Sequence, residues 1–144
     1  MGFFNNKTIT LYNRHIEKDS GYEVYIPTVL NNVNLVETQG ANISTSGMSD
    51  ADSAKLYIDM LSIENNEKRY VSPKEYSRLS SDDMQETFTF TKGEDFFVKG
   101  DTSAQPISKS SFYEYMKSHF DGVYKITTVD VYPDVLPHYE IGGK

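Results

Sequence analysis

The sequence predicts a mainly β protein: an antiparallel β-barrel or β-sandwich with one or two short α-helices covering it. At least six runs have strand character, whereas two have helical character. Eleven tyrosines and eight phenylalanines, with no tryptophan, suit pleated surfaces on which aromatic rings pack well. The 144 residues fit a single domain, 1–144, with enough chain to bury a sizeable core.

The N-terminal segment predicts a three-stranded antiparallel meander. In the run KTITLYN, Ile9 and Leu11 alternate with polar residues, which is the period of a half-buried strand. The EKDSG segment and the following Asn-Asn pair have turn chemistry and would separate the strands. Pro27 cannot donate a ladder hydrogen bond, so the second strand is expected to bend there or to lie at an edge. The predicted strands cover residues 7–13, 22–30 and 33–38.

The middle of the chain is expected to continue with a strand and then a capped helix. The run AKLYIDML, residues 54–61, resumes the strand pattern. In SPKEYSRL, residues 72–79, Ser72 stands at the N-cap, Pro73 at the first helical position and Glu75 at the third. These three residues form a capping box that opens a short helix.

Two Lys-Gly pairs in FTFTKGEDFFVKGD raise the question of a phosphate-binding loop. Such a loop needs the pattern G-x-x-x-x-G-K-[ST] between a strand and a helix. Here Gly93 and Gly100 are each followed by an acid, Glu94 and Asp101, which would repel phosphate. The stretch is expected instead to form a hairpin of two strands around KGE. In that hairpin Gly93 adopts a positive φ and the flanking aromatic residues enter the core.

The C-terminal part predicts a second helix and two more strands. Phe112, Met116 and Phe120 recur every four residues, which places them on one face of a helix. Asp121-Gly122 would end this helix, and the chain is expected to close with a turn and a short edge strand in PDVLPHYEIGGK. Between them, VYKITTVDVY predicts a regular strand. One face of it is expected to carry Val123, Lys125, Thr127, Val129 and Val131.

One group of potential metal-binding or acid–base side chains stands out near the C-terminal end. Asp130, Asp134, His138 and Glu140 could gather at one end of the sheet, and such mixtures occur in metal and hydrolytic sites. Their spacing is not diagnostic. In the structural alternative Asp130 ends a strand, Asp134 follows Pro133 in a turn, and the other two face solvent. We expect the structural role, with no catalytic, cofactor-binding or metal-binding residues.

The charge and the missing cysteines exclude several classes of function. The formal charge is −7, from 21 acidic and 14 basic residues, and such a surface repels nucleic-acid phosphates. A channel through which DNA slides without sticking could also be acidic. The absence of cysteine excludes disulfides and thiolate metal sites, and it agrees with a reducing cytoplasm. No apolar run long enough to span a membrane and no secretory signal is visible, so no membrane partner is expected.

The segment 38–53, TQGANISTSGMSDADS, is the least core-like part of the chain. Only Ile43 and Met48 are sizeable apolar groups, so its burial could not offset the entropy lost on ordering. Loops of this length are usually either functional or disordered. We expect a flexible loop that orders on assembly, with Ile43 and Met48 as anchors and with Asp50 and Asp52 turned toward water or a channel. A disordered connection of no consequence is the alternative.

Three stretches of the chain occur in an order that points to a known class. They are TITLYNR…YIPTVLNNVNLVET, KGEDFFVKGD and DGVYKITTVDVY…LPHYEIGGK. In this order the sequence resembles small phage and prophage minor capsid or head–tail connector proteins of Gram-positive bacterial siphophages. The resemblance implies a head-completion or stopper role. It implies a virion protein of the neck, made in the bacterial cytoplasm, that forms a ring between the portal or adaptor and the tail.

The same resemblance sets the expected partners. They are connector proteins on the portal or adaptor side and on the tail side, with self-association in a ring, no cofactor and no enzymatic activity. Two alternatives stay open: another small phage tail or neck binding module, and a small hydrolase that uses the group from Asp130 to Glu140. A charge of −7 opposes self-association, so the isolated chain is expected to be a monomer that forms a ring only on its partner.

Overall fold

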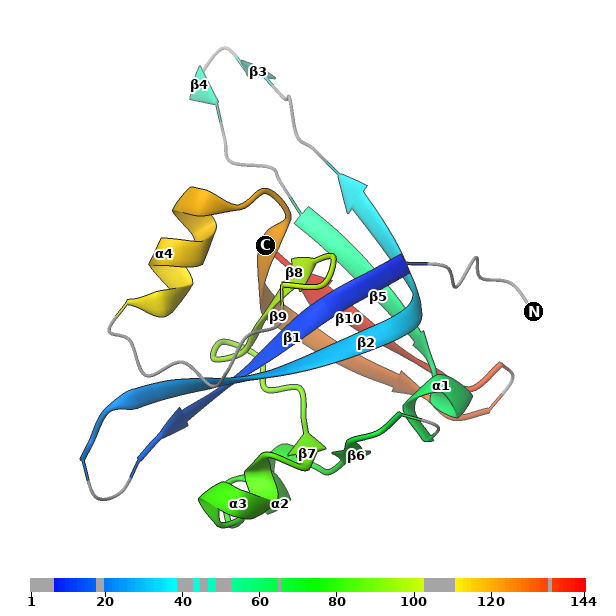
Figure 1. Cartoon of the computed structure of the whole chain (residues 1–144). Helices are drawn as coiled ribbons and strands as arrows, with labels where there is room; N and C mark the ends of the chain where they lie inside the picture. Colours follow the sequence, from blue (N-terminus) through cyan, green and yellow to red (C-terminus); the bar gives the residue numbers. More distant parts are fainter. Residues whose placement is uncertain are drawn as a thin grey trace.

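Six strands close into a barrel in which every neighbouring pair is antiparallel (Figure 1). The mainly β fold class is therefore confirmed, and the architecture is a barrel, not a sandwich. The computed structural model describes residues 7–17, 20–38, 43–44, 47–48, 53–64, 66–102, 111–134 and 136–144, with only the backbone at 43–44 and 47–48. In barrel order the strands are β1 (Lys7–Ile16), β2 (Glu23–Thr38), β5 (Ser53–Asp59), β10 (His138–Gly143), β9 (Val123–Tyr132) and β8 (Phe96–Lys99).

β2 is one continuous strand of 16 residues, so the predicted turn at the Asn-Asn pair, and with it the three-stranded meander, is wrong. Asn32 adopts a left-handed φ of 59°, which asparagine tolerates better than most residues. The pairing register shifts beside it, because Lys7 lies opposite Val33 while Ile9 lies opposite Leu30. Such a β-bulge bends a strand without ending it. The bend lets β2 pair first with β1 and then with β5.

The helices are short, and the described part of the chain contains four of them where one or two were expected. α2 begins as the capping box predicts: the Ser72 hydroxyl accepts a 3.3 Å hydrogen bond from the backbone N–H of Glu75. β5 ends at Asp59, so the last two residues of the predicted strand 54–61 begin α1 instead. The helices are α1 (Met60–Glu64), α2 (Pro73–Tyr76), α3 (Ser81–Met84) and α4 (Phe112–His119).

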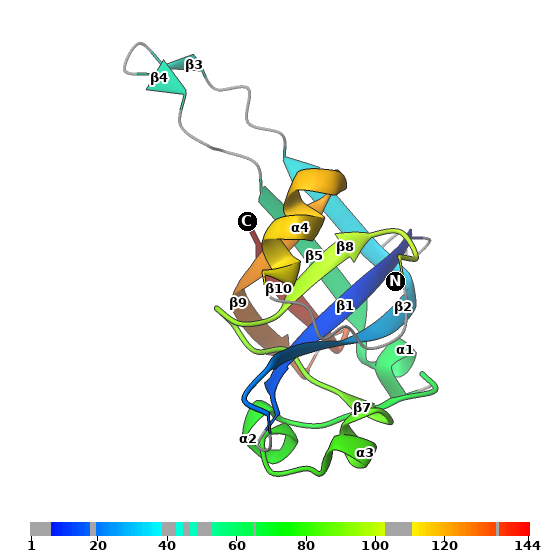
Figure 2. The same cartoon turned by 60° about the vertical axis from the view of Figure 1, so that its left-hand side comes forward.

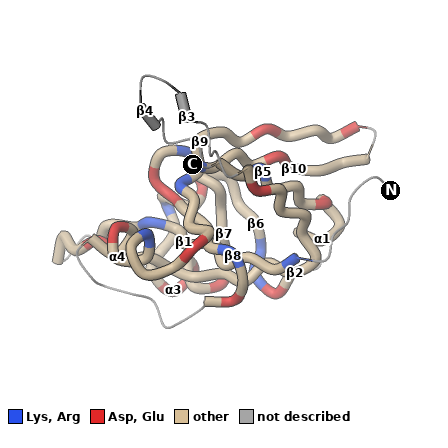
Figure 3. Tube along the Cα trace, turned by 90° about the horizontal axis from the view of Figure 1, so that it is seen from above, with Lys and Arg blue, Asp and Glu red and all other residues tan. Residues whose placement is uncertain are grey.

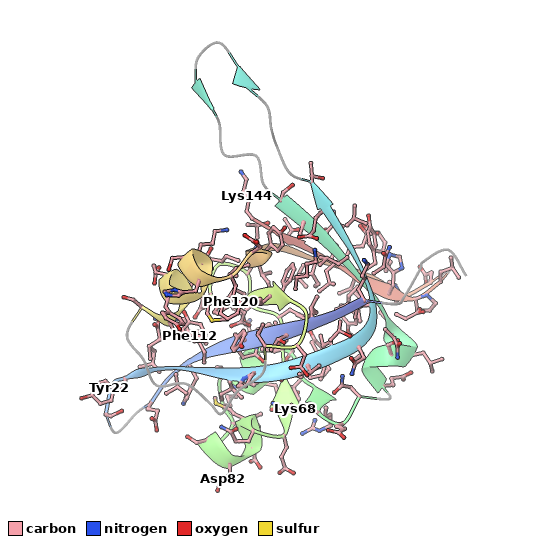
Figure 4. The ribbon with its side chains drawn as sticks, turned by 45° about the horizontal axis from the view of Figure 1, so that its top comes forward. Tyr22, Lys68, Asp82, Phe112, Phe120 and Lys144 are labelled. Atoms are coloured by element: carbon pink, nitrogen blue, oxygen red, sulfur yellow. The ribbon has the colours of Figure 1, made fainter. Side chains whose placement is uncertain are left out.

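The β1–β2 hairpin extends beyond the barrel as a two-stranded arm. β1 pairs with β2 along nearly its whole length, but it pairs with β8 only from Ile9 to Tyr12. Figure 4 labels Tyr22 at the end of the arm, where this side chain is 67% exposed. Pro27 lies in the part of β2 that has a strand neighbour on one side only, as predicted from its missing N–H. Its carbonyl oxygen accepts a 2.6 Å hydrogen bond from Lys68 Nζ.

Gly93 turns the chain as predicted, with a φ of 81°, but the strands on either side of it do not form a hairpin. β7 (Thr87–Phe88) pairs in parallel with β6 (Arg69–Tyr70), whereas β8 pairs with β1 and β9. The sequence could not distinguish a hairpin from a turn between strands that pair elsewhere, because the same turn residues occur in both. The aromatic residues of this stretch are buried as expected: Phe88, Phe90, Phe96 and Phe97.

Among the described residues, buried side chains form three clusters. The largest fills the barrel, and the other two lie outside it against the arm. Figure 2 shows α4 beside β8 on one side, with α2 and α3 below the arm. Under α4, Phe112 and Met116 are buried on the face that the spacing predicted, although Phe120 is 43% exposed. Under α2 and α3, Tyr76 and Met84 pack against residues of β2.

β9 has the predicted bounds, 123–132, but its faces do not alternate strictly. Ile126 and Val129 contact the same core although three residues separate them. The register with β10 shifts here, because Gly143 lies opposite Ile126 while Gly142 lies opposite Thr128. This bulge moves the alternation by one residue. β10 pairs with both β5 and β9, so the prediction of an edge strand is also wrong.

Gly143→Ala is expected to lower the free energy of unfolding by about 1–3 kcal/mol, because it overpacks the barrel. A Cβ at Gly143 would lie 2.8 Å from Tyr124 Cβ and 3.0 Å from Phe97 Cζ. Urea titration measures the loss. As a control, Gly21→Asn adds a side chain where no atom lies within 4 Å, at a φ of +73° that asparagine tolerates. Equal losses in the two variants would contradict the close approach.

Candidate functional site

The group that the sequence singled out lies along the β9–β10 hairpin, where two of its members make contact. His138 Nε2 donates a 2.9 Å hydrogen bond to Glu140 Oε2. Asp130 lies opposite Glu140 in the ladder, and Asp134 is exposed in the connection between the strands. Among the residues that the structure describes, no three His, Asp or Glu side chains form a group that could hold a metal ion.

His138 has a hydrogen-bond acceptor at each ring nitrogen. Its Nδ1 donates to the carbonyl oxygen of Leu136 at 2.6 Å, and its Nε2 donates to Glu140. Burial lowers the pKa of His138, but the hydrogen bonds to Glu140 and Leu136 and the charges of Glu140 and Asp59 outweigh burial and raise it. The hydrogen bond from Nδ1 links the imidazole ring to the backbone at Leu136.

This end of the hairpin exposes apolar side chains beside acidic ones. Val131, Tyr132 and Leu136 are each close to half exposed, at 47–49%. Leu136 has a φ of 51°, and a left-handed conformation of this kind costs a residue with a Cβ about 1–3 kcal/mol. Exposed apolar groups and costly backbone conformations both favour a contact surface. We define the hairpin tip as Asp130, Val131, Tyr132, Asp134 and Leu136.

A shallow, open cleft of about 560 Å³ lies at the other end of the same hairpin, and none of the described residues that line it is acidic. Lys125 Nζ lies 4.4 Å from the centre of the Tyr113 ring, which is a cation–π distance. Glu94, which follows the cleft residue Gly93, has its carboxylate 3.2 Å from the guanidinium of Arg14. We define the basic cleft by the side chains of Lys92, Tyr113, Lys125 and Lys144.

The two Lys-Gly pairs use their glycine N–H groups within the protein. Gly93 N–H donates to the carbonyl oxygen of Ile126 at 2.7 Å, and Gly100 N–H donates to that of Thr8 at 2.8 Å. A phosphate loop needs such N–H groups free and pointing at the ligand. The geometry agrees with the sequence argument against a phosphate site here.

Sequence reasoning missed a buried carboxyl group, that of Asp95, which is 1% exposed. Its Oδ2 accepts hydrogen bonds from Asn13 Nδ2 at 2.8 Å and from the N–H of Thr91 at 2.9 Å. Its Oδ1 accepts one from the N–H of Arg14 at 2.9 Å. Burial raises the pKa of Asp95 to about 7, although these three bonds favour the charged form. In the sequence Asp95 follows a Gly-Glu turn, where an aspartate is normally solvent-exposed, so no signal marked it.

The candidate loop residues are only partly described. Asp50 and Asp52 lie outside the described residues, as do the side chains of Ile43 and Met48. The backbones of these two apolar residues lie opposite each other in a separate two-stranded sheet. That sheet consists of β3 (Ile43–Ser44) and β4 (Gly47–Met48).

The connection that carries β3 and β4 joins two strands that are already paired. Thr38, the last residue of β2, lies opposite Ser53, the first residue of β5. Two residues facing each other at the end of a ladder need only a two-residue turn between them. Closure of the barrel therefore does not require residues 39–52.

The fold and these surfaces define a small antiparallel β-barrel protein with an acidic, apolar tip and a basic cleft at opposite ends of one hairpin. Residues 4–144 match a protein family of unknown function, DUF6751, and the chain belongs to that family. No curated protein and no solved structure matches the chain. Within the described residues, no helix is both long and apolar enough to cross a membrane.

Asp95 is expected to make the protein less stable as the pH rises from 5 to 8. Its pKa of about 7 in the folded state lies above the ordinary value of 3.8, so the folded protein holds a proton that the unfolded chain has lost. The resulting stabilisation is complete below about pH 4 and disappears as the pH rises through about 7. Urea unfolding at several pH values should show a smaller decline for Asp95→Asn than for the wild type.

Two comparisons isolate the Asp95 contribution. His138 also loses stabilisation as the pH rises through its raised pKa, but it is present in both proteins and cancels in the difference. Asp82→Asn, at an exposed position of α3, should leave the wild-type profile unchanged. Parallel profiles for the wild type and Asp95→Asn would contradict the raised pKa.

Proposed function

We propose that the chain is a structural virion protein of a phage or prophage: a head–tail connector component that forms a ring between the portal or adaptor and the tail. The observation that carries this proposal is the connection between β2 and β5. Thr38 and Ser53 pair, yet the chain inserts residues 39–52 between them, with β3 and β4 in a sheet of their own. An insertion that barrel closure does not require is expected to make contacts outside the barrel.

Two further features support a place in an assembly. The three stretches TITLYNR…YIPTVLNNVNLVET, KGEDFFVKGD and DGVYKITTVDVY…LPHYEIGGK resemble those of phage connector proteins. A subunit of a ring also needs two different contact surfaces, one for each neighbour. The hairpin tip and the basic cleft are two such surfaces. The proposed partners are connector proteins on the portal or adaptor side and on the tail side, and the proposal involves no cofactor.

Antibodies against the chain are expected to label the neck of particles released by the phage or prophage that encodes it. Negative-stain electron microscopy with gold-labelled antibody gives the position directly. Label confined to another part of the tail would favour the alternative of a different tail module. Particles that lack the chain altogether would overturn a virion role.

Replacing residues 39–52 with Asn-Gly is expected to abolish head–tail joining without unfolding the barrel. Asn-Gly suits the two-residue turn that the paired Thr38 and Ser53 require. The free energy of unfolding should stay within about 1 kcal/mol of the wild type, since no barrel strand is changed. Phage complementation measures joining as the ratio of infectious particles to free heads and free tails.

A full-length control separates the role of the loop side chains from that of loop length. Ile43→Ser together with Met48→Ser keeps every backbone atom and removes the two proposed anchors. This variant is also expected to fail in joining. Normal numbers of infectious particles from both variants would show that the insertion has no role in joining.

A further inference from the structure

The hairpin tip and the basic cleft lie at opposite ends of β9 and point to different neighbours. Lys125 lies near the start of β9, and Asp134 follows its end. At about 3.3 Å per residue, the seven steps from Lys125 to Tyr132 span roughly 23 Å. Figure 3 shows basic residues beside the C-terminal end of the chain and acidic residues farther along β9. The tip of one chain therefore cannot enter its own cleft.

We propose that the hairpin tip of one copy docks in the basic cleft of a second copy of this chain. The inference deepens the proposed function, on which the setting of this contact in a ring rests, and it names the surfaces through which copies meet. The contact joins two different surfaces of identical chains. Such head-to-tail contacts repeat from copy to copy and produce closed rings or open filaments.

Charge complementarity favours a second copy as the occupant. The tip presents the exposed carboxylates of Asp130 and Asp134, whereas the cleft presents Lys92, Lys125 and Lys144 with no acid among its lining residues. Asp130 lies opposite Glu140 in the ladder, and the Glu140 carboxylate already contacts His138 and Lys55. Lysines supplied by a neighbouring copy would pair with the exposed carboxylates of Asp130 and Asp134.

Apolar groups on the two surfaces also match. The tip offers Val131, Tyr132 and Leu136, all close to half exposed, and the cleft offers the partly exposed ring of Tyr113. The Tyr132 ring stacks on His138 with their centres 5.1 Å apart, and this contact orients the ring on the tip. Such an aromatic anchor entering a lined cleft is the common form of an interface hot spot.

The contact is expected to be weak between isolated chains. The net charge of −7 gives every copy a long-range repulsion from every other, and only the local match of tip and cleft opposes it. Covalent capture is therefore the suitable test, and the chain has no cysteine of its own to interfere. Pro133→Cys places a thiol on the tip without changing a charge. Thr127→Cys places one at the exposed rim of the cleft.

A mixture of the Pro133→Cys and Thr127→Cys variants, treated with a short bismaleimide at high protein concentration, is expected to give a covalent heterodimer. Its yield should exceed several-fold that of Pro133→Cys mixed with Ser81→Cys, which places a thiol at an exposed position of α3. The chain that carries both Pro133→Cys and Thr127→Cys should give a ladder of higher oligomers.

Charge reversal tests whether the charges of the tip and the cleft are complementary, whatever the distance between the two thiols. Asp134→Lys on the tip and Lys92→Glu at the cleft should each lower the heterodimer yield about fivefold, the factor that about 1 kcal/mol produces. Combining the two reversals should restore the yield, because the pair is then opposite in charge again. High salt should lower the wild-type yield, since exposed charges are screened.

The contact is overturned if the yield equals that of the Ser81→Cys control or if the charge reversals leave it unchanged. Failure to cross-link combined with binding of a fluorescent oligothymidylate, itself lost in Lys92→Glu, would assign the cleft to nucleic acid instead. The two proposals fail separately. Cross-linked copies without label at the phage neck would refute the proposed function alone, and neck label without cross-linked copies would refute this contact alone.

Discussion

The buried link between Asn13 and Asp95 is the interaction on which the rest of the structure depends. Asn13 donates to Asp95 and to the carbonyl oxygen of Thr89, and the Asp95 carboxyl group also accepts the N–H groups of Arg14 and Thr91. The backbone oxygen of Asp95 accepts the N–H of Ile126. Asp95 thus links three parts of the chain: β1, β9 and the segment that precedes β8. Buried polar groups are costly unless satisfied, so this network favours one arrangement of the three elements over others.

The barrel that this link closes leaves two kinds of surface. Some features serve to close the barrel: the close packing at Gly142 and Gly143 and the bulges in β2 and β9. The β9–β10 tip, by contrast, keeps exposed apolar groups, exposed acids and a left-handed leucine that closure does not require. Features that cost stability in the isolated chain are expected where the chain meets something else.

The candidate site could be predicted only where its members are near one another in sequence. His138 and Glu140 are two residues apart on one strand and therefore share a face, so their contact follows from the strand period. The cation–π contact between Tyr113 and Lys125 joins a helix to a strand, and no local sequence pattern predicts it. Asp95 looked like an ordinary turn residue, because burial of its carboxyl group depends on Asn13, which lies far away in the chain. When two side chains are far apart in the chain, a single sequence contains no pattern that predicts their contact in the folded protein.

What the sequence by itself determined is local. The strand character of β1 and β9, the Ser72 cap of α2, the positive φ of Gly93 and the buried face of α4 all follow from contacts within a few residues. The predicted alternation of buried and exposed residues is wrong for β1, which buries both faces from Ile9 to Asn13, and it is not strict in β9. Only the tertiary structure decided three other features. β2 bends where a turn was expected, β7 and β8 pair with different strands, and β10 has a strand neighbour on each side where an edge strand was expected. A turn, a bulge and a bend use the same residues, and the choice among them depends on the free energy of long-range strand pairing and core packing.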